Sequence, residues 1–413
     1  MRKNLLSYLF VALCSIPLFT SCSNDDDDDN FVICPIGATE YTSASGLNLT
    51  YEGEPMLGKL VRFLPDAFDG TKAQLTLEGE PLDWSSLLSR ADASVSTMAS
   101  PGVFPGSTSV TIDVDLTING DQCSFSGVSE TDYCTFKYEG KVSAGSMDLS
   151  LSDVMLKNDA LAATRWNLLP YDELDANNGP VHIVWTSEKG VEIFSGFELP
   201  IESVLKLALS MPLIGEGDDA KAAAQMLNAV LQNVTFRPNG NIVATYMDVA
   251  NGSTSWERSP SNLAQYVVEA DGQMRVFLNP QAIMAATSRA ARAARENNVG
   301  GDMSAVLVQA IQAISRMVSE GVPLSYTRDA DNMTVFLDEE VLLPLLKGIV
   351  VPLLQNEDFM NLIIEAIASD PSFGSMSGMV VGALQSLPEV INTTTELEIG
   401  LNLVKAQADL MHN

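Results

Sequence analysis

Histidine is nearly absent from this chain, and cysteine is scarce. The 413 residues include two histidines, His182 and His412, and five cysteines. A Ser-His-Asp triad or a histidine-rich metal centre needs an imidazole in a defined position, and His412 stands next to last, where chain ends fray. His182 alternates with apolar neighbours in a strand-like run, which favours a packed or edge role. We therefore expect no metal, no organic cofactor and no enzyme activity.

Positive charge is also in short supply. Lys and Arg number 23 against 53 Asp and Glu, which gives a formal net charge of −30. A surface this acidic, without a basic cluster, repels phosphate backbones and anionic lipid headgroups. We expect no nucleic-acid partner and interpret the acidity as solubilising. The acidic residues leave open a pair of carboxylates of the kind that glycosidases use, but no spacing singles out such a pair.

One long apolar run stands at the start of the chain. Arg2 and Lys3 precede the apolar stretch 5–19, which is too short for a membrane span and leads through small residues to Cys22. This arrangement predicts a signal peptide over residues 1–21. The segment that ends in Cys22 resembles a bacterial lipobox, with Phe19 where Leu is usual. The resemblance implies cleavage before Cys22 and lipidation of that residue.

Consecutive aspartates follow the predicted lipidation site. Residues 25–29 are all Asp, and adjacent carboxylates repel one another, so we interpret residues 22–30 as the lipid anchor with a solvated leash. The run that begins at Cys22 also resembles the acidic export signal of Bacteroidetes lipoproteins. That resemblance implies a lipoprotein of the outer membrane, anchored through its N-terminal lipid at the cell surface. The periplasmic side of that membrane is the alternative.

The mature chain begins with a β-rich region. Apolar and polar residues mostly alternate with period two in six segments, which indicates antiparallel strands with one buried face. Gly, Pro, Asp and Ser fill the gaps, as turns require. We predict an antiparallel β domain over residues 31–170, either a sandwich or a calycin-like barrel. The predicted strands cover residues 47–51, 60–64, 73–77, 110–118, 134–138 and 147–154.

The second predicted domain, residues 180–413, mixes hairpins with apolar helices. Asn239-Gly240 and Asp271-Gly272 are dipeptides that tight hairpin turns prefer, and each is flanked by strand-like runs. The fold class is therefore α+β, an antiparallel β domain followed by a mixed domain. Further strands are predicted at 324–326, 333–337 and 395–403, and helices at 199–213, 220–231, 280–296, 303–319, 341–354, 359–368 and 376–387.

Several segments carry a resemblance to a known family. They are Gly58-Lys59 with residues 73–77, the hairpin 236–246, and residues 256–266. They resemble segments of Bacteroides-type surface lipoproteins that share a conserved domain of unknown function. The resemblance implies the surface address and a β-rich fold, and it brings no activity and no catalytic residues.

Three cysteines remain once the signal peptide and the lipid carrier are set aside, namely Cys34, Cys123 and Cys134. Export permits disulfides, and three thiols allow three different single bridges. Cys123 and Cys134 lie in two short strand-like runs separated by a turn, where cross-strand partners can meet the spacing of a bridge. We predict the Cys123–Cys134 bridge, with no bridge at all as the alternative.

Recognition is the function class that the sequence favours. Trp84, Trp166, Trp185 and Trp256 are the indoles that can stack on sugar rings. Trp256 lies between two polar, turn-forming runs, so we predict it as a ligand contact at the surface. We expect a non-catalytic protein that binds an extracellular ligand, with a glycan slightly favoured. The alternatives are a hydrophobic ligand such as a lipid, held among Met- and Leu-rich helices, and a structural subunit of the cell surface.

The export prediction has a direct test. Replacing residues 25–29 by alanine removes the charge of the leash while Cys22 keeps its lipid. Antibody staining of intact cells is expected to fall to the level of a periplasmic control, with total protein unchanged in lysates. Surface staining equal to that of the unchanged protein would contradict an export role for the aspartates.

Overall fold

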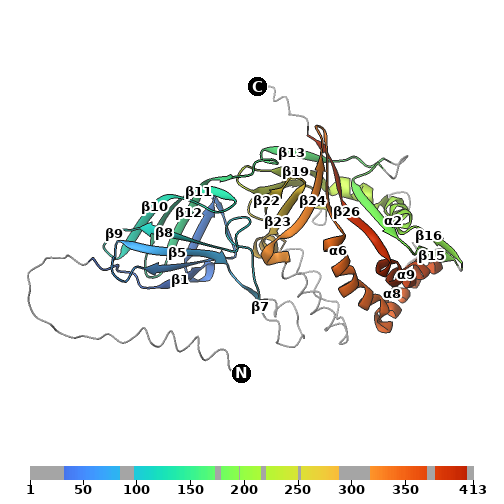
Figure 1. Ribbon diagram of the computed structural model, residues 1–413, viewed down its shortest axis with the longest axis horizontal. Coiled ribbons are helices and arrows are strands. Elements are labelled where there is room, and N and C mark those ends of the chain that lie inside the picture. The colour runs from blue at the N-terminus through green and yellow to red at the C-terminus, as the bar shows by residue number, and fades with distance from the viewer. Residues whose placement is uncertain are drawn as a thin grey trace, which may run out of the picture.

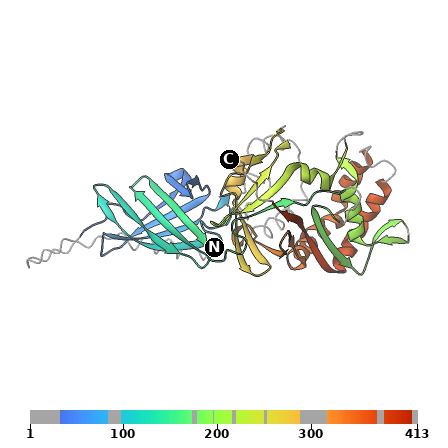
Figure 2. The same cartoon turned by 90° about the horizontal axis from the view of Figure 1, so that it is seen from above.

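The computed structural model describes residues 32–83, 97–172, 178–194, 196–214, 220–249, 253–287, 317–369 and 377–406. The predicted signal peptide, Cys22, the aspartate run and Trp84 lie outside these ranges, as do most of the predicted helix 303–319 and the second half of 280–296. The described part is elongated, with two β units side by side and helices at one end (Figure 1). The view from above shows the same order (Figure 2).

The first unit, the N-terminal sandwich, consists of two sheets joined at corners. Its strands are β1 (Thr39–Thr42), β2 (Leu47–Tyr51), β3 (Glu54–Pro55), β4 (Lys59–Pro65), β5 (Lys72–Gly79), β8 (Ser109–Asp115), β9 (Thr117–Asn119), β10 (Gln122–Glu130), β11 (Cys134–Val142) and β12 (Met147–Leu156). The sheet orders are β1-β4-β5-β8 and β3-β2-β12-β11-β10-β9. The short helix η1 (Ser43–Ser45) turns the chain from one sheet to the other, and β8 runs almost directly into β9. Of these strand pairs, β12 and β2 are parallel.

The interior of the sandwich is filled by its own side chains. The alternation of β5 and β8 buries every second residue, as in Leu75, Leu77 and Ile112. Residues 101–105 are buried and close the end of the sandwich that faces the second unit, where Phe104 stacks on Phe136 with ring centroids 4.1 Å apart. The interior of the sandwich is therefore a hydrophobic core made of its own side chains. Two short strands, β6 (Leu82–Asp83) and β7 (Thr97–Met98), pair with each other and form a separate two-stranded sheet.

The second unit, the C-terminal barrel, is a closed antiparallel ring. Its strands are β13 (Thr164–Leu168), β19 (Leu231–Phe236), β20 (Asn241–Tyr246), β22 (Ala264–Ala270), β23 (Gln273–Leu278), β24 (Val322–Arg328), β25 (Asn332–Leu337) and β26 (Thr394–Lys405). They pair in this order, and β26 closes the ring on β13. Two further strands extend it, β21 (Glu257–Arg258) on β20 and β14 (Val181–Ser187) on β26. Both predicted hairpins are confirmed, with Gly240 and Gly272 at φ +81° and +78°.

Helices cover the part of β26 and β14 that extends beyond the ring, namely α2 (Ile201–Ser210), α6 (Glu339–Leu345), the π-helix η4 (Leu346–Val350), α7 (Val351–Gln355), α8 (Glu357–Ser369) and α9 (Ser377–Asn392). The helix α3 (Ala223–Val230) packs beside α2 and β19, and α4 (Pro280–Thr287) lies at the junction with the sandwich, where Gln281 approaches Gly58. The pairs β15 (Val191–Phe194) with β16 (Phe197–Leu199) and β17 (Pro212–Ile214) with β18 (Lys221–Ala222) complete the unit. Trp185, Ile201, Val390 and Leu397 form the centre of this second core. No helix of the described residues is both long and apolar enough to span a membrane.

The two units share one hydrophobic core. A single cluster of buried side chains runs from Tyr41 in the sandwich to Leu403 in the barrel. The Asn239-Gly240 turn reaches into the sandwich, where the hydroxyl of Tyr51 donates to the carbonyl of Asn239 at 2.6 Å. Further bonds across the junction run from Asn262 to the carbonyl of Pro55 (3.1 Å), from Asn279 to that of Leu57 (2.9 Å) and from Asn158 to that of Val268 (3.1 Å). The units therefore form one packed body.

Two sequence predictions need correction. The sequence predicts a β domain over residues 31–170, but β13 pairs with β19 and β26 of the barrel, so the sandwich ends with β12 at Leu156. The predicted Cys123–Cys134 bridge does not fit the geometry. In the β10–β11 hairpin Cys123 is opposite Val142 and Glu130 is opposite Thr135, which places the two thiols at opposite ends of the hairpin. All three described cysteines are free thiols.

A buried lysine fastens the closing segment of the sandwich. Lys59 is 1% exposed, and its ammonium group donates to the carbonyls of Pro101 and Gly102 at 2.8 and 2.9 Å. Both acceptors are uncharged carbonyl groups. Burial lowers the pKa of Lys59 from 10.5 to about 7. The folded state therefore releases this proton at a lower pH than the unfolded chain does.

This difference predicts that stability rises with pH above 7. Between pH 7 and 9 the unfolded chain keeps the Lys59 proton while the folded protein loses it, so the free energy of unfolding should rise by up to about 2 kcal/mol. Urea unfolding of the protein and of Lys59→Met at a series of pH values measures this. The variant, which has no titrating group there, should show a flatter pH dependence over that window. Parallel curves would contradict the assignment.

Candidate functional site

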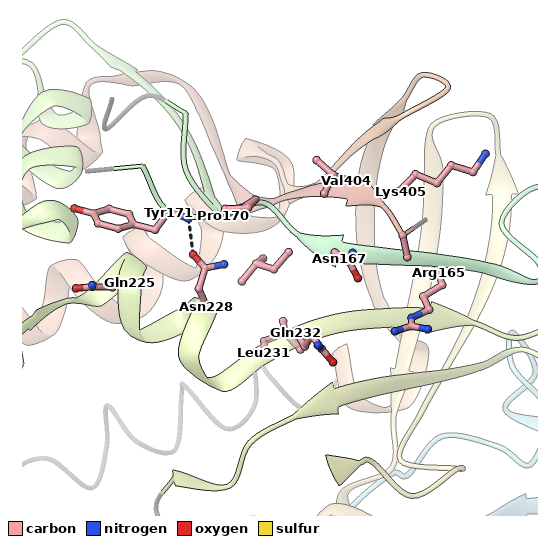
Figure 3. Close-up of a pocket in the computed structure, with 12 residues that line it drawn as sticks. Arg165, Asn167, Pro170, Tyr171, Gln225, Asn228, Leu231, Gln232, Val404 and Lys405 are labelled. Atoms are coloured by element: carbon pink, nitrogen blue, oxygen red, sulfur yellow. Dashed lines mark hydrogen bonds between the residues drawn. The ribbon is translucent and has the colours of Figure 1, made fainter. Parts of the chain in front are cut away.

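An open groove of about 900 Å³ runs along the seam that closes the barrel. Its walls come from β13, from the end of β26, and from α3 with the start of β19, which are far apart in the sequence (Figure 3). Asn167 and Val404 are register partners on the outer face of the seam. The groove is lined by Arg165, Asn167, Leu168, Pro170, Tyr171, Gln225, Asn228, Leu231, Gln232, Val404, Lys405 and Ala406.

Asn228 holds one wall of the groove in place. Its side-chain carbonyl accepts from the backbone N–H of Tyr171 at 2.7 Å, and its amide group donates to the carbonyl of Leu169 at 3.0 Å. The segment that leaves β13 is thereby clamped to α3. The clamp is also fastened to β26, because the N–H of Leu169 donates to the carbonyl of Asn402 at 2.9 Å. Tyr171 is thus positioned beside Gln225 at one end of the groove (Figure 3).

The chemistry of the lining differs from that of the average surface. The chain carries 53 acidic residues, yet none of the described residues that line this groove is acidic. Arg165 and Lys405 stand at the end opposite Tyr171 (Figure 3). Amide side chains both donate and accept hydrogen bonds, so Asn167, Gln225 and Gln232, which take no part in the clamp, together match the hydroxyl groups of a hydrated polymer. A half-buried tyrosine adds an aromatic surface with a polar tip.

Trp256 is exposed and lies near this groove. It is 40% exposed, whereas Trp166 and Trp185 are 2% and 7% exposed and belong to the two cores. The next residue, Glu257, pairs with Tyr246 of β20, and Tyr246 pairs with Leu231 of the groove. Adjacent strands lie about 5 Å apart, so two strand spacings separate the backbone beside Trp256 from the groove wall. The structure does not place Trp256 in the lining itself.

The amides of the groove carry no sequence signal of their own. Gln and Asn residues are scattered through the chain, and those of the groove meet through the pairing of β13 with β19 and β26. Sequence reasoning missed β13 as a strand of the barrel, and with it the groove.

The other side chains that could act in catalysis or binding have partners within the protein. His182 lies 2.7 Å from a carboxylate oxygen of Glu398, and its ring packs against Phe336 with centroids 5.4 Å apart. The indole N–H of Trp185 donates to the hydroxyl of Thr394 at 2.8 Å. Over the described ranges, no cluster of three or more His, Cys, Asp or Glu side chains is arranged to hold a metal ion.

The inward face of the barrel is filled unevenly. Trp166, Phe236 and Tyr266 are buried and lie at the junction with the sandwich, where Phe236 and Tyr266 meet edge to face at 5.0 Å. Further along the same face, Leu324, Leu337 and other apolar residues are half-buried, and Ile399 packs against the helical core. The barrel therefore presents partly accessible apolar surface towards the helices.

Comparison with protein-family models, with curated proteins and with solved structures finds no significant match to this chain.

The role of Asn228 can be tested by substitution. Asn228→Ala removes two hydrogen bonds and should lower the free energy of unfolding by about 1–2 kcal/mol. Gln225→Ala on the same helix is the matched control and should change it by less than about 0.5 kcal/mol. Urea denaturation of both variants measures the difference. Equal stability of the two variants would show that the clamp does not hold this wall.

Proposed function

We propose that this protein is a lipid-anchored surface lipoprotein of the outer membrane that binds a glycan, without catalysis, in the seam groove. The observation that carries the proposal is the lining of that groove, where four amide side chains, Tyr171 and two basic residues occur together without an acidic residue among the described residues. Binding of sugars relies on such amides for the hydroxyl groups and on aromatic faces for the apolar side of the ring.

The shape of the groove suits a polymer. Pockets for small apolar ligands are concave and mostly hydrophobic, whereas this groove is open along the surface and mixes polar with apolar walls. A chain of sugars can enter such a groove from the side and extend beyond it. Trp256 stands within reach of such an extension and is a second, outer contact.

The position of the groove in the fold also supports display. The described chain enters at the end of the sandwich that carries β9, and the barrel lies at the other end (Figure 1). The N-terminal lipid and leash would therefore attach to the sandwich, which acts as a rigid spacer because it shares its core with the barrel. The groove would be held away from the membrane and towards soluble polymers.

A hydrophobic ligand is the second candidate. It is supported by the half-buried apolar residues of the barrel interior and by exposed apolar side chains on the helices, such as Leu207 and Leu362 at 57% and 59% exposure. A lipid chain would bury these groups and gain about 25 cal/mol for each Å² of apolar surface removed from water. The two functions predict different sites, the outer seam for a glycan and the helical side of the barrel for a lipid.

The two functions can be separated in one experiment. The mature protein from its own host is applied to a glycan array and, in parallel, studied by native mass spectrometry. Array binding is expected, and Tyr171→Ala or Gln232→Ala should weaken it about tenfold or more, since each removes a direct contact. Trp256→Ala should have a smaller effect, about threefold, because it lies outside the groove.

Gln273→Ala is the matched control and should bind as the unchanged protein does. Gln273 is exposed and is the first residue of β23, away from the seam. Glycan binding that all three site variants retain in full would remove the groove from the proposal. A silent array together with a co-purified lipid would favour the hydrophobic ligand, and silence in both would leave a structural subunit.

A further inference from the structure

Two cysteines that are distant in the sequence meet at the outer end of the sandwich. The sulfur atoms of Cys34 and Cys123 are 3.9 Å apart, although 89 positions separate the residues. Cys123 is 1% exposed and lies opposite Ile118 of β9, whereas Cys34 is half-buried in the segment that leads into β1. Side-chain rotation of two thiols in contact can bring the sulfurs to the bonded distance of about 2.05 Å.

The segment that carries Cys34 is also held on its other side. The N–H of Gly70 donates to the carbonyl of Val32 at 2.9 Å. A Cβ atom at Gly70 would stand 2.1 Å from that carbonyl and 2.5 Å from the nitrogen of Cys34, so the approach requires glycine. Cys34 therefore has a defined backbone position beside Cys123.

The third thiol has a different environment. Cys134 is fully buried and is the register partner of Leu156 on β12. Its sulfur lies 3.4 Å from the hydroxyl oxygen of Thr131. It sits at the opposite end of the hairpin from Cys123. Burial raises the pKa of Cys134 as it raises that of Cys123, so Cys134 differs from Cys123 in its distance from Cys34 and not in its acidity.

We propose that Cys34 and Cys123 form a disulfide in the exported protein and that Cys134 stays reduced. The thiolate of Cys34 attacks the disulfide of an extracytoplasmic protein oxidant, and one thiolate of the oxidant leaves. The sulfur of Cys123, after loss of its proton, then attacks the Cys34 sulfur of this mixed disulfide. The oxidant takes up two electrons and leaves as a dithiol, and two protons are lost from the cysteines.

The bridge has a mechanical role that follows from its position. The proposed lipid anchor and leash join the described chain just before Cys34, and β1, the first strand, has four residues and is an edge strand. A pull on the anchor would act on this short edge strand. With the bridge, the same force passes into β10, a strand of nine residues held on both sides by β9 and β11. The inference rests on the proposed export, because export brings the two thiols into an oxidising compartment.

Peptide mapping tests the pairing. Full-length protein is prepared from the cell envelope, alkylated with N-ethylmaleimide in denaturant, digested without reduction and read by mass spectrometry. We expect a linked peptide pair with Cys34 and Cys123, and label on Cys134 alone among the three. A second sample is reduced, unfolded and refolded with oxidised glutathione, which supplies an oxidant independently of the location of the protein.

The two samples separate the proposals. A Cys34–Cys123 link in the refolded sample with free thiols in the envelope sample would support the pairing and contradict export. Three labelled cysteines in both samples, or a link that includes Cys134, would overturn the pairing.

Thermal unfolding gives a second readout. Dithiothreitol should lower the Tm of the unchanged protein by about 5 °C, because the reduced chain loses a long-range crosslink. Cys34→Ser, Cys123→Ser and the double variant should all unfold at this lower Tm and no longer respond to dithiothreitol. Cys134→Ser is the matched control and should keep the response. An unchanged response in Cys34→Ser would contradict the bridge.

Discussion

The pairing of β26 with three other strands is the constraint on which the C-terminal unit depends. This strand pairs with β25 along one edge, and along the other it pairs first with β14 and then with β13. Pairing with β13 closes the ring, and pairing with β14 extends the sheet under the helices. A free sheet edge would expose unpaired backbone groups, and ring closure removes it. The seam groove exists because this closure sets the end of β26 beside β13 and α3.

The two β units behave as one body because each closes the other. The buried segment 101–105, fixed by Lys59, covers the end of the sandwich, and the Asn239-Gly240 turn of the barrel packs against it. A Cβ at Gly240 would stand 2.9 Å from Pro105, so glycine serves both the hairpin turn and this contact. A junction of this kind fixes the orientation of the sandwich relative to the groove, as the proposed surface display requires.

Local patterns in the sequence were sufficient for much of the fold and for little of the site. The turns at Gly240 and Gly272 and the alternation of β5 and β8 follow from neighbours in the chain, so they could be predicted. Strand β13 could not, because its five residues gain their partners from β19 and β26, far along the chain. The same holds for the groove, whose amides form no motif, and for Cys34, which meets Cys123 through the folding of the sandwich.

Hydrogen exchange read by mass spectrometry tests the central claim, that closure of the barrel at β13 and β26 builds the binding site. The full-length protein is measured alone and with a pool of neutral and acidic oligosaccharides. The account predicts slow exchange at residues 165–168 and 402–405 in the free protein, and further protection of 165–171, 225–232 and 404–406 with sugar. Fast exchange at the seam in the free protein, or sugar-induced protection confined to other segments, would contradict it.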